Sequence, residues 1–242
     1  MNFPIINVFD EPYEVREMRE LSNDEFFEKA LRTGKISFTQ RQHIIETINN
    51  HYEAAHYMLR VAQDNSLESH IDRALENSFS KIMNHMQKTL PNSISTYQSS
   101  YPDYDIAAVS NDIKRFGGLL HQGQVLFHGG YCRHEVGETL SIDRPLSTSF
   151  CPQIALRNAE WREKAYDADE VNIFVLTVSS TTVKAYVLPL TGKFGHEKEV
   201  LISPGITLTV KKKTLVRNDY AVRKSNYPEK SVSAYIIEID LE

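Results

Sequence analysis

The spacing of apolar residues changes near residue 118, and this change limits the possible folds more than any other feature of the chain. Before it, apolar residues recur every three or four positions, which is typical of helices with one buried face. After it, they alternate or form short continuous runs, which is typical of strands. We therefore predict an α+β protein, with a helical lobe over residues 1–118 and a mostly antiparallel β core over residues 119–242, both parts of one domain.

In the first part, the spacing predicts four helices and one loop. The first helix has the clearest ends, because Ser22 and Glu25 form a capping-box pattern and Gly34 follows as a stop signal. The second helix is expected to follow Thr39 and to extend to residue 62. The third and fourth helices are expected over 67–90 and 106–116, and the polar stretch 92–103 predicts a loop.

The second part contains five segments with strand patterns. The segment 171–178 is almost entirely apolar, as expected of a strand that is buried on both faces. Pro204 and Gly205 separate two further segments and predict a hairpin that joins them. The five expected strands are 124–128, 171–178, 199–203, 206–211 and 234–241.

Composition excludes several classes of protein. The chain has 27 basic and 32 acidic residues, a net charge of −5 that falls entirely in residues 1–118, and duplex-binding proteins are usually basic. No apolar stretch is long enough to span a membrane, and the start of the chain does not resemble a signal peptide. Two cysteines cannot form a disulfide framework. We therefore expect a cytoplasmic protein with no membrane partner and no strong signal for nucleic acid.

Several common catalytic and cofactor-binding motifs are absent from the sequence. There is no Gly-x-Gly-x-x-Gly fingerprint, no phosphate-binding P-loop, no His-Glu-x-x-His pair and no Cys-x-x-Cys pair. The nine histidines do not fall at metal-ligand spacings, so no metal is expected.

The pair Glu197 and Glu199 is the first candidate for chemistry. If the strand already begins at Glu197, the period of two places both carboxylates on one side, with Cβ atoms roughly 6–7 Å apart. One carboxylate could then stabilise a developing cation while the other positions or deprotonates a nucleophile. The alternative is a solvated charge cluster at the end of a strand.

Two further motifs precede this pair. The hydroxyls of Ser147, Thr148 and Ser149 could hold a carboxylate by hydrogen bonds, or could simply belong to a turn. His128 ends a predicted strand and is expected to point into a cleft, and Gly129 after it would let a ligand approach the backbone. The alternative for His128 is a purely structural role.

Taken in order, His128, Ser147 to Ser149 and Glu197 to Glu199 resemble the motifs of the mono-ADP-ribosyltransferases, in particular the branch with an Arg, Ser, Glu triad. The loop 191–196 and the segments beside it also resemble that family, and the resemblance covers roughly residues 119–242. His128 stands where that branch usually carries arginine, and histidine at this place is typical of the diphtheria-toxin-like branch.

The resemblance implies an ADP-ribosyltransferase fold, NAD⁺ as co-substrate and transfer of ADP-ribose to a target protein, with arginine as the natural acceptor. Glu199 would stabilise the oxocarbenium ion of the ribose, and Glu197 would orient or deprotonate the acceptor. Ser147 would hold Glu199, and His128 would anchor the adenosine side of NAD⁺.

The resemblance also assigns roles to neighbouring residues. Gly129, Thr148 and Ser149 would belong to the NAD⁺ site, and Arg157, or Arg162 further along, would meet the pyrophosphate. Phe194 would touch the target protein. Enzymes of this kind are often phage or bacterial toxins or effectors, so action in the cytoplasm of a host or recipient cell is expected.

Three alternatives remain open at this point. The same fold could act as an NAD glycohydrolase, or it could modify a nucleic acid or small molecule. It could also be an inactive binding module, because histidine is a weaker partner for phosphate than arginine.

Overall fold

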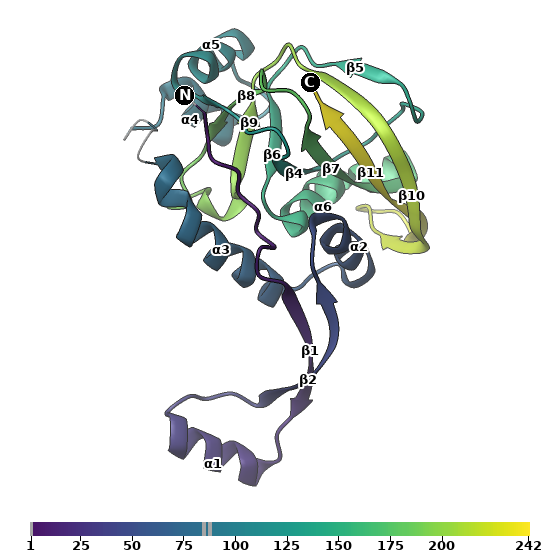
Figure 1. The fold of residues 1–242 in the computed structure, drawn as a ribbon. Helices are drawn as coiled ribbons and strands as arrows, with labels where there is room; N and C mark the ends of the chain where they lie inside the picture. Colours follow the sequence, from purple (N-terminus) through teal and green to yellow (C-terminus); the bar gives the residue numbers. More distant parts are fainter. Residues whose placement is uncertain (1, 84–85, 87–88) are drawn as a thin grey trace.

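The computed structural model covers residues 1–242 and describes all of them except 1, 84–85 and 87–88. A nine-stranded sheet with the order β3-β8-β9-β6-β4-β7-β11-β10-β5 forms the centre of the molecule (Figure 1). Neighbouring strands are antiparallel throughout, apart from the parallel pair of β7 and β11. The predicted α+β class with a mostly antiparallel sheet is therefore confirmed.

Apart from Gly118, the first residue of β3, the strands of this sheet come from the second part of the chain. They are β3 (Gly118–Leu119), β4 (Val125–Gly129), β5 (Thr139–Ser141), β6 (Leu146–Ser149), β7 (Glu170–Val178), β8 (Lys184–Val187), β9 (Glu199–Ile202), β10 (Thr207–Val222) and β11 (Lys230–Leu241). The α-helices of the described residues are α1 (Asn23–Thr33), α2 (His51–Val61), α3 (Asn65–Met83), α4 (Asn92–Ser100), α5 (Ile106–Phe116), α6 (Pro152–Glu160) and α7 (Lys164–Ala168).

The predicted helix over 22–34 is confirmed together with its caps. The Ser22 side chain accepts the backbone N–H of Glu25, the Glu25 carboxylate accepts the backbone N–H of Ser22, and Gly34 adopts a left-handed φ of 67°. Helix α5 is confirmed over 106–116. The third predicted helix is confirmed as α3 up to Met83. Its expected extension to residue 90 is wrong at residues 86, 89 and 90, which are not helical, and 84–85 and 87–88 lie outside the described residues.

The helix predicted after Thr39 is wrong in its first half. Residues 39–48 form the strand β2 (Thr39–Ile48), which pairs with a strand that the sequence did not indicate, β1 (Tyr13–Glu20). The helical spacing of Ile44 and Ile48 is compatible with either structure, so pairing with a distant segment decided between them. The helix α2 begins only after Asn50, whose side chain accepts the backbone N–H of Glu53.

Two other local predictions are also corrected. Most of the expected loop over 92–103 is helix α4, in which Ile94 and Tyr97, three residues apart, are buried. The segments around Gly205 form strands, but β9 lies between β8 and β6 while β10 lies between β11 and β5. They do not form the predicted hairpin, because the backbone of Gly205 and Ile206 instead bonds to the backbone of Ile142.

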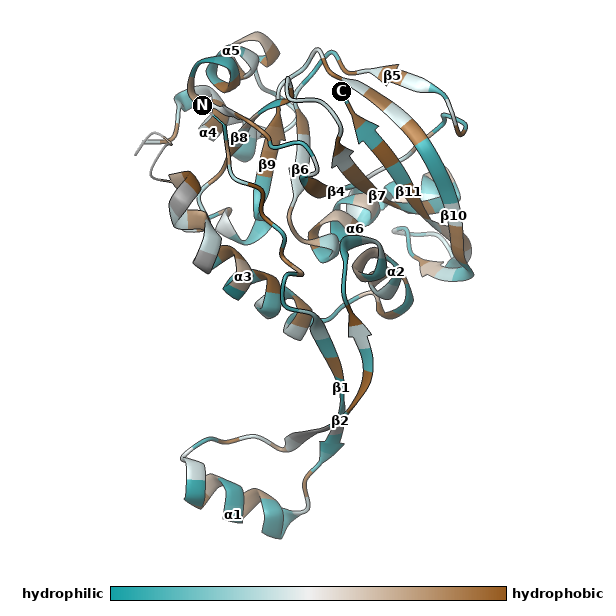
Figure 2. Cartoon of the chain, in the orientation of Figure 1, coloured by the Kyte–Doolittle hydropathy of each residue, from teal (hydrophilic) through white to brown (hydrophobic). Residues whose placement is uncertain are grey.

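The core lies between the sheet and the helices. Helix α6 packs on β4 and β7, and α2 packs on α6 and β10. Figure 2 shows the apolar residues concentrated along the central strands, and Val171 to Val178 is almost entirely buried, as expected. The side chain of Gln124 both donates to and accepts from the backbone of Ile6, which joins the two parts of the chain. Both cysteines are free thiols.

The strands β1 and β2 form a separate two-stranded ribbon with α1 at its far end (Figure 1). We call residues 13–48 the arm. Among the described residues, no helix is both long and apolar enough to cross a membrane.

Candidate active site

The three motifs singled out in the sequence meet on the adjacent strands β4, β6 and β9. Strand β6 lies between the other two, so Ser149 pairs with Phe127 on one side and with Glu199 on the other. The hydroxyl of Ser147 donates to Oε1 of Glu199 at 2.6 Å, and the carbonyl of Ser147 accepts a hydrogen bond from Nδ1 of His128 at 2.7 Å. Ser147 therefore links the Glu199 carboxyl group to the His128 ring.

Glu199 is a buried carboxyl group, with 4% of its surface exposed. Besides Ser147, it accepts a hydrogen bond from the side-chain amide of Gln98 at 3.3 Å. Burial raises the pKa of Glu199 to about 7, the bonds from Ser147 and Gln98 oppose this rise, and the charge of nearby Glu197 adds to it. The carboxyl group is therefore balanced between its two protonation states near neutral pH.

His128 is a neutral imidazole at neutral pH. Burial lowers its pKa to about 4, and the charge of Lys164 contributes in the same direction. Because a carbonyl can only accept, the bond to Ser147 places the ring proton on Nδ1 and leaves Nε2 as an acceptor. Such a ring can accept a hydrogen bond from a ribose hydroxyl, but it cannot supply a positive charge to a phosphate.

The other two hydroxyls of the Ser-Thr-Ser motif bond to the protein backbone. Thr148 donates to the carbonyl of Val200 at 2.6 Å, and Ser149 donates to the carbonyl of Glu197 at 2.7 Å. Both residues are buried. Their hydroxyls hold β9 and the turn before it in place, and a place for these two residues in the NAD⁺ site stays a prediction.

The two glutamates do not share a strand as expected. Strand β9 begins at Glu199, while Glu197 ends a short 3-10 helix, Gly195–Glu197, and Lys198 between them adopts a left-handed φ of 50°. The alternation argument is therefore wrong. The carboxylates nevertheless lie close enough for Glu197 to raise the pKa of Glu199, and burial raises the pKa of Glu197 itself.

Lys198 is a site residue that the sequence analysis missed. Its side chain is 2% exposed, and its ammonium group lies 3.1 Å from a carboxylate oxygen of Glu68 and 3.0 Å from one of Asp72, both on α3. It also donates to the carbonyl of His196 at 3.1 Å. In the sequence it lies within a charge cluster, and only the packing of α3 shows that it fixes the turn between the two glutamates.

Gly129 and Arg157 serve packing contacts that the sequence analysis did not expect. A Cβ added to Gly129 would lie 1.7 Å from the carbonyl oxygen of Ala155, so the glycine is needed for α6 to approach β4. The approach of a ligand to Gly129 stays a prediction. Arg157 on α6 is exposed and donates to Glu68 at 3.3 Å. The structure thus places Arg157 beside Lys198 and α3.

Lys164 and Arg162 lie on the side of His128. Both side chains are exposed, yet partial loss of hydration lowers the pKa of Lys164, with the charge of Arg162 adding to the effect. Both cations lie over the ring of Trp161, Arg162 at 4.2 Å and Lys164 at 5.3 Å from its centroid. Neither has an ion-pair partner within the part of the chain that the structure describes, so this group of charges can accept an anion.

Helix α4 covers Glu199 with aromatic residues. Burial raises the pKa of Tyr97, the charge of Glu199 adds to this rise, and a hydrogen bond with Ser147 opposes it, so Tyr97 lies against both residues. The ring of Tyr97 contacts those of Tyr101 and Tyr104, and Tyr101 contacts Trp161. This contribution was missed because the segment was predicted as a loop.

Phe194 directly precedes the turn that carries Glu197. Its side chain is partly exposed, and the Lys193 ammonium lies 5.0 Å from the centroid of its ring. Contact with a target protein stays a prediction for this residue. Among the described residues, no group of three or more His, Cys, Asp or Glu side chains could hold a metal ion.

No family model matches the chain, and no curated protein matches it by sequence. The chain is similar in structure to C2-I, the enzymatic component of the C2 toxin from Clostridium botulinum, with a TM-score of 0.42 and 12% identity over 69% of this chain and 46% of that one. The chain therefore matches about half the length of C2-I.

Two other similar structures are ADP-ribosyltransferases. Vis from Vibrio splendidus, solved with agmatine, has a TM-score of 0.41 and 15% identity over 80% of this chain and 87% of that one. C3larvin toxin from Paenibacillus larvae has a TM-score of 0.34 and 9% identity over 77% of this chain and 92% of that one. Likenesses this distant do not assign a function, so the functional conclusion depends on the geometry of the site itself.

Proposed function

We propose that this chain is an NAD⁺:protein mono-ADP-ribosyltransferase that transfers ADP-ribose to arginine and releases nicotinamide. The observation that carries the proposal is the hydrogen bond of 2.6 Å from the hydroxyl of Ser147 to the buried Glu199. The backbone carbonyl of the same Ser147 accepts a hydrogen bond from the neutral ring of His128. The ordered motifs of the sequence support the same conclusion.

Glu199 is placed to stabilise positive charge on a sugar. When the bond between nicotinamide and ribose breaks, the bonding electrons leave with neutral nicotinamide, and C1 of the ribose becomes an oxocarbenium centre. The Glu199 carboxylate, shielded from water and held by Ser147, would stabilise that charge more than it stabilises NAD⁺. The contact with Gln98 has to open for a ribose hydroxyl to reach the other carboxylate oxygen.

Glu197 would act on the acceptor. It lies on the turn next to Glu199, and its raised pKa suits a base that takes a proton as arginine attacks the ribose. A carboxylate is also a natural partner for a guanidinium group, which supports arginine as the acceptor residue. The partner is then a target protein, and Phe194 beside this turn would contact it.

Lys164 and Arg162 would bind the pyrophosphate of NAD⁺. The charge of Lys164 acts on His128 and is repelled by that of Arg162, and neither cation has a counter-charge among the described residues, so an anion between them would offset this repulsion. These cations supply the charge that a neutral His128 lacks. Lys164→Met should raise KM for NAD⁺ about tenfold, as expected for one charge-assisted contact, with little change in kcat.

The deciding experiment uses NAD⁺ labelled in its adenylate phosphate, incubated with this protein and a cell lysate. We expect label on protein and its loss by at least about 100-fold in Glu199→Gln. Glu197→Gln should still release nicotinamide but no longer label protein, and Glu135→Gln, an exposed carboxylate, serves as control.

The other outcomes identify the alternatives. Label only in free ADP-ribose would mean a glycohydrolase, and label on nucleic acid or a small molecule would mean a different acceptor. Full activity of Glu199→Gln would refute the mechanism, and no binding of millimolar NAD⁺ by calorimetry would indicate an inactive module. The sequence resemblance supports a phage or bacterial toxin or effector that acts in the cytoplasm of a host or recipient cell.

A further inference from the structure

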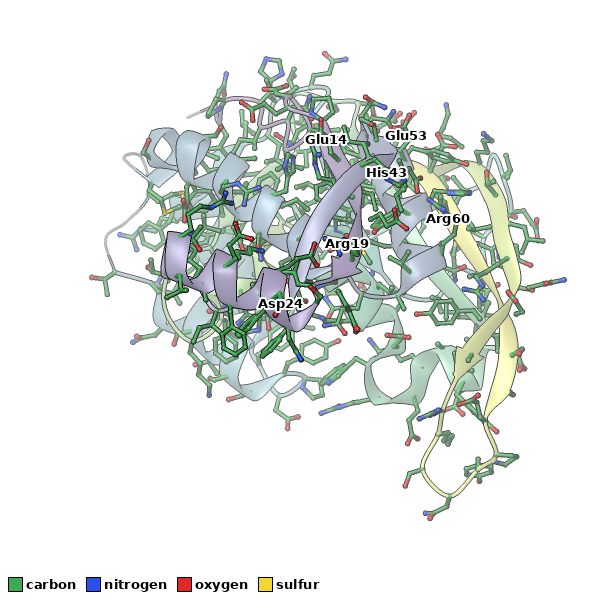
Figure 3. The ribbon with its side chains drawn as sticks, turned by 90° about the horizontal axis from the view of Figure 1, so that it is seen from below. Glu14, Arg19, Asp24, His43, Glu53 and Arg60 are labelled. Carbon is green, nitrogen blue, oxygen red and sulfur yellow. The ribbon has the colours of Figure 1, made fainter. Side chains whose placement is uncertain are left out.

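The arm exposes a set of large apolar side chains far from the candidate active site. Helix α1 has no buried residue and lies at the end of the ribbon, nearest the viewer in Figure 3, where Asp24 and Arg19 are labelled. The exposed fractions are 62% for Phe27, 89% for Leu31, 80% for Ile36 and 66% for Phe38. The tip of the arm therefore has an apolar face with no partner within the described chain.

Local interactions alone support this tip only weakly. Isolated helices below about 12–15 residues and isolated two-stranded ribbons are marginal in water, and α1 has 11 residues. The tip is held by the capping box of Ser22 and Glu25, by two hydrogen bonds from Arg19 to Glu25, and by stacking of Phe26 on Phe38 at 4.4 Å. Covering the apolar face would stabilise the arm further.

Charged residues follow this apolar face in a fixed order. At 3.6 residues per turn, Phe27 and Leu31 share one face of α1, and Asp24, Glu28 and Arg32 follow one side of it. The acidic residues come first and the basic ones, Arg32 and then Lys35, come last. All four charged side chains are exposed, and none has an ion-pair partner in the described residues.

We propose that two copies of this chain associate through α1, antiparallel about a two-fold axis. In that arrangement Asp24 and Glu28 of each copy face Arg32 and Lys35 of the other, and Phe27 packs beside the other copy's Leu31. A parallel pairing would leave these charges without opposite partners. The arm is thus complementary to itself in one orientation only.

The exposed area is sufficient for such a pair. Because a large side chain carries on the order of 200 Å² of surface, Phe27, Leu31, Ile36 and Phe38 at 62–89% exposure offer roughly 600 Å² per copy. Two copies then offer at most about 1,200 Å², the lower end of the range for specific interfaces, where weak and transient complexes lie.

The first test is sedimentation equilibrium of the full chain at concentrations from about 1 to about 100 µM, a range in which a weak dimer dissociates on dilution. We expect a dimer, and Leu31→Glu should weaken it by at least about 100-fold, because it places a charged carboxylate in the apolar contact with the other copy's Phe27. Val136→Glu is the matched control, since Val136 is an exposed apolar residue, 57% accessible, outside the arm. Far-UV circular dichroism checks that each variant is folded.

The second test exchanges charges. Asp24→Lys with Glu28→Lys makes the side of α1 entirely basic, and Arg32→Glu with Lys35→Glu makes it entirely acidic. Each double variant should be monomeric alone, and their mixture should form a heterodimer. A wild-type chain that stays monomeric at 100 µM, a dimeric Leu31→Glu variant, or double variants that do not pair when mixed would each overturn the proposal. All arm variants should keep wild-type NAD⁺ cleavage per chain, so this result is independent of the proposed reaction.

Discussion

The substitution Glu199→Gln should make the folded protein more stable while it removes activity. The pKa of Glu199 is raised from its ordinary value of 4.5 to about 7 because the carboxyl group is buried. The folded state therefore binds its proton more tightly than the unfolded chain does, and ionising it in place opposes folding. At 1.36 kcal/mol per pKa unit, the cost at pH 8 is about 3 kcal/mol. It decreases to about 1 kcal/mol at pH 5.5 and disappears below 4.5.

Glutamine removes this cost, since it is neutral at every pH and keeps an oxygen that can accept the hydrogen bond from Ser147. Urea unfolding followed by circular dichroism at pH 8 and pH 5.5 measures the gain in unfolding free energy. We expect about 3 kcal/mol at pH 8 and about 1 kcal/mol at pH 5.5, with no such dependence in Glu135→Gln. A variant that is less stable than wild type at pH 8, or a gain that does not change with pH, would show that Glu199 is not buried as described.

Three further predictions follow from the site. Because the proposed mechanism needs ionised Glu199, kcat/KM for NAD⁺ cleavage should decrease as the pH falls through about 7. Lys198→Met removes the buried ammonium group from Glu68, which keeps its contacts with Arg157 and Gln153, so denaturant unfolding should show a loss of about 2 kcal/mol. The same substitution should lower kcat at least tenfold, with partial rescue by arginine, and an unchanged kcat would contradict the role of Lys198. Gly129→Ala places a methyl group against the Ala155 carbonyl and should lower the unfolding free energy by about 3 kcal/mol, read from the urea midpoint; a neutral effect would contradict the close packing of α6.

Local sequence patterns predicted those parts of the fold that depend on interactions between residues close together in the sequence. The capping box of α1 is an interaction between residues three apart, so it is visible in the sequence. The strand β2 and helix α4 were misread because their structure depends on distant partners, β1 for the former and tertiary burial of Tyr97 for the latter. The false hairpin at Gly205 has the same origin, since a turn signal does not say which strands lie beside it.

The candidate site shows the same division. The link between Ser147 and Glu199 was expected from the family resemblance and is present, although their catalytic roles stay predictions. The roles of Lys198 and Gly129 were invisible, because they depend on α3 and α6, whose positions no local pattern gives. Lys164 was missed because a lysine beside an arginine in a helical segment resembles an ordinary solvated charge.

The contact of Lys198 with α3 also limits how such a protein can evolve by recombination. Glu68 and Asp72 precede the glutamate turn by more than a hundred residues, yet they hold its backbone in place. Neither residues 1–118 nor residues 119–242 can therefore be replaced by the corresponding part of another protein without loss of these contacts. A chimaera that joins this sheet to helices from another protein would keep both glutamates but lose Glu68 and Asp72, which hold the turn between them. Recombination near residue 118 should therefore produce proteins that fold but have no catalytic activity.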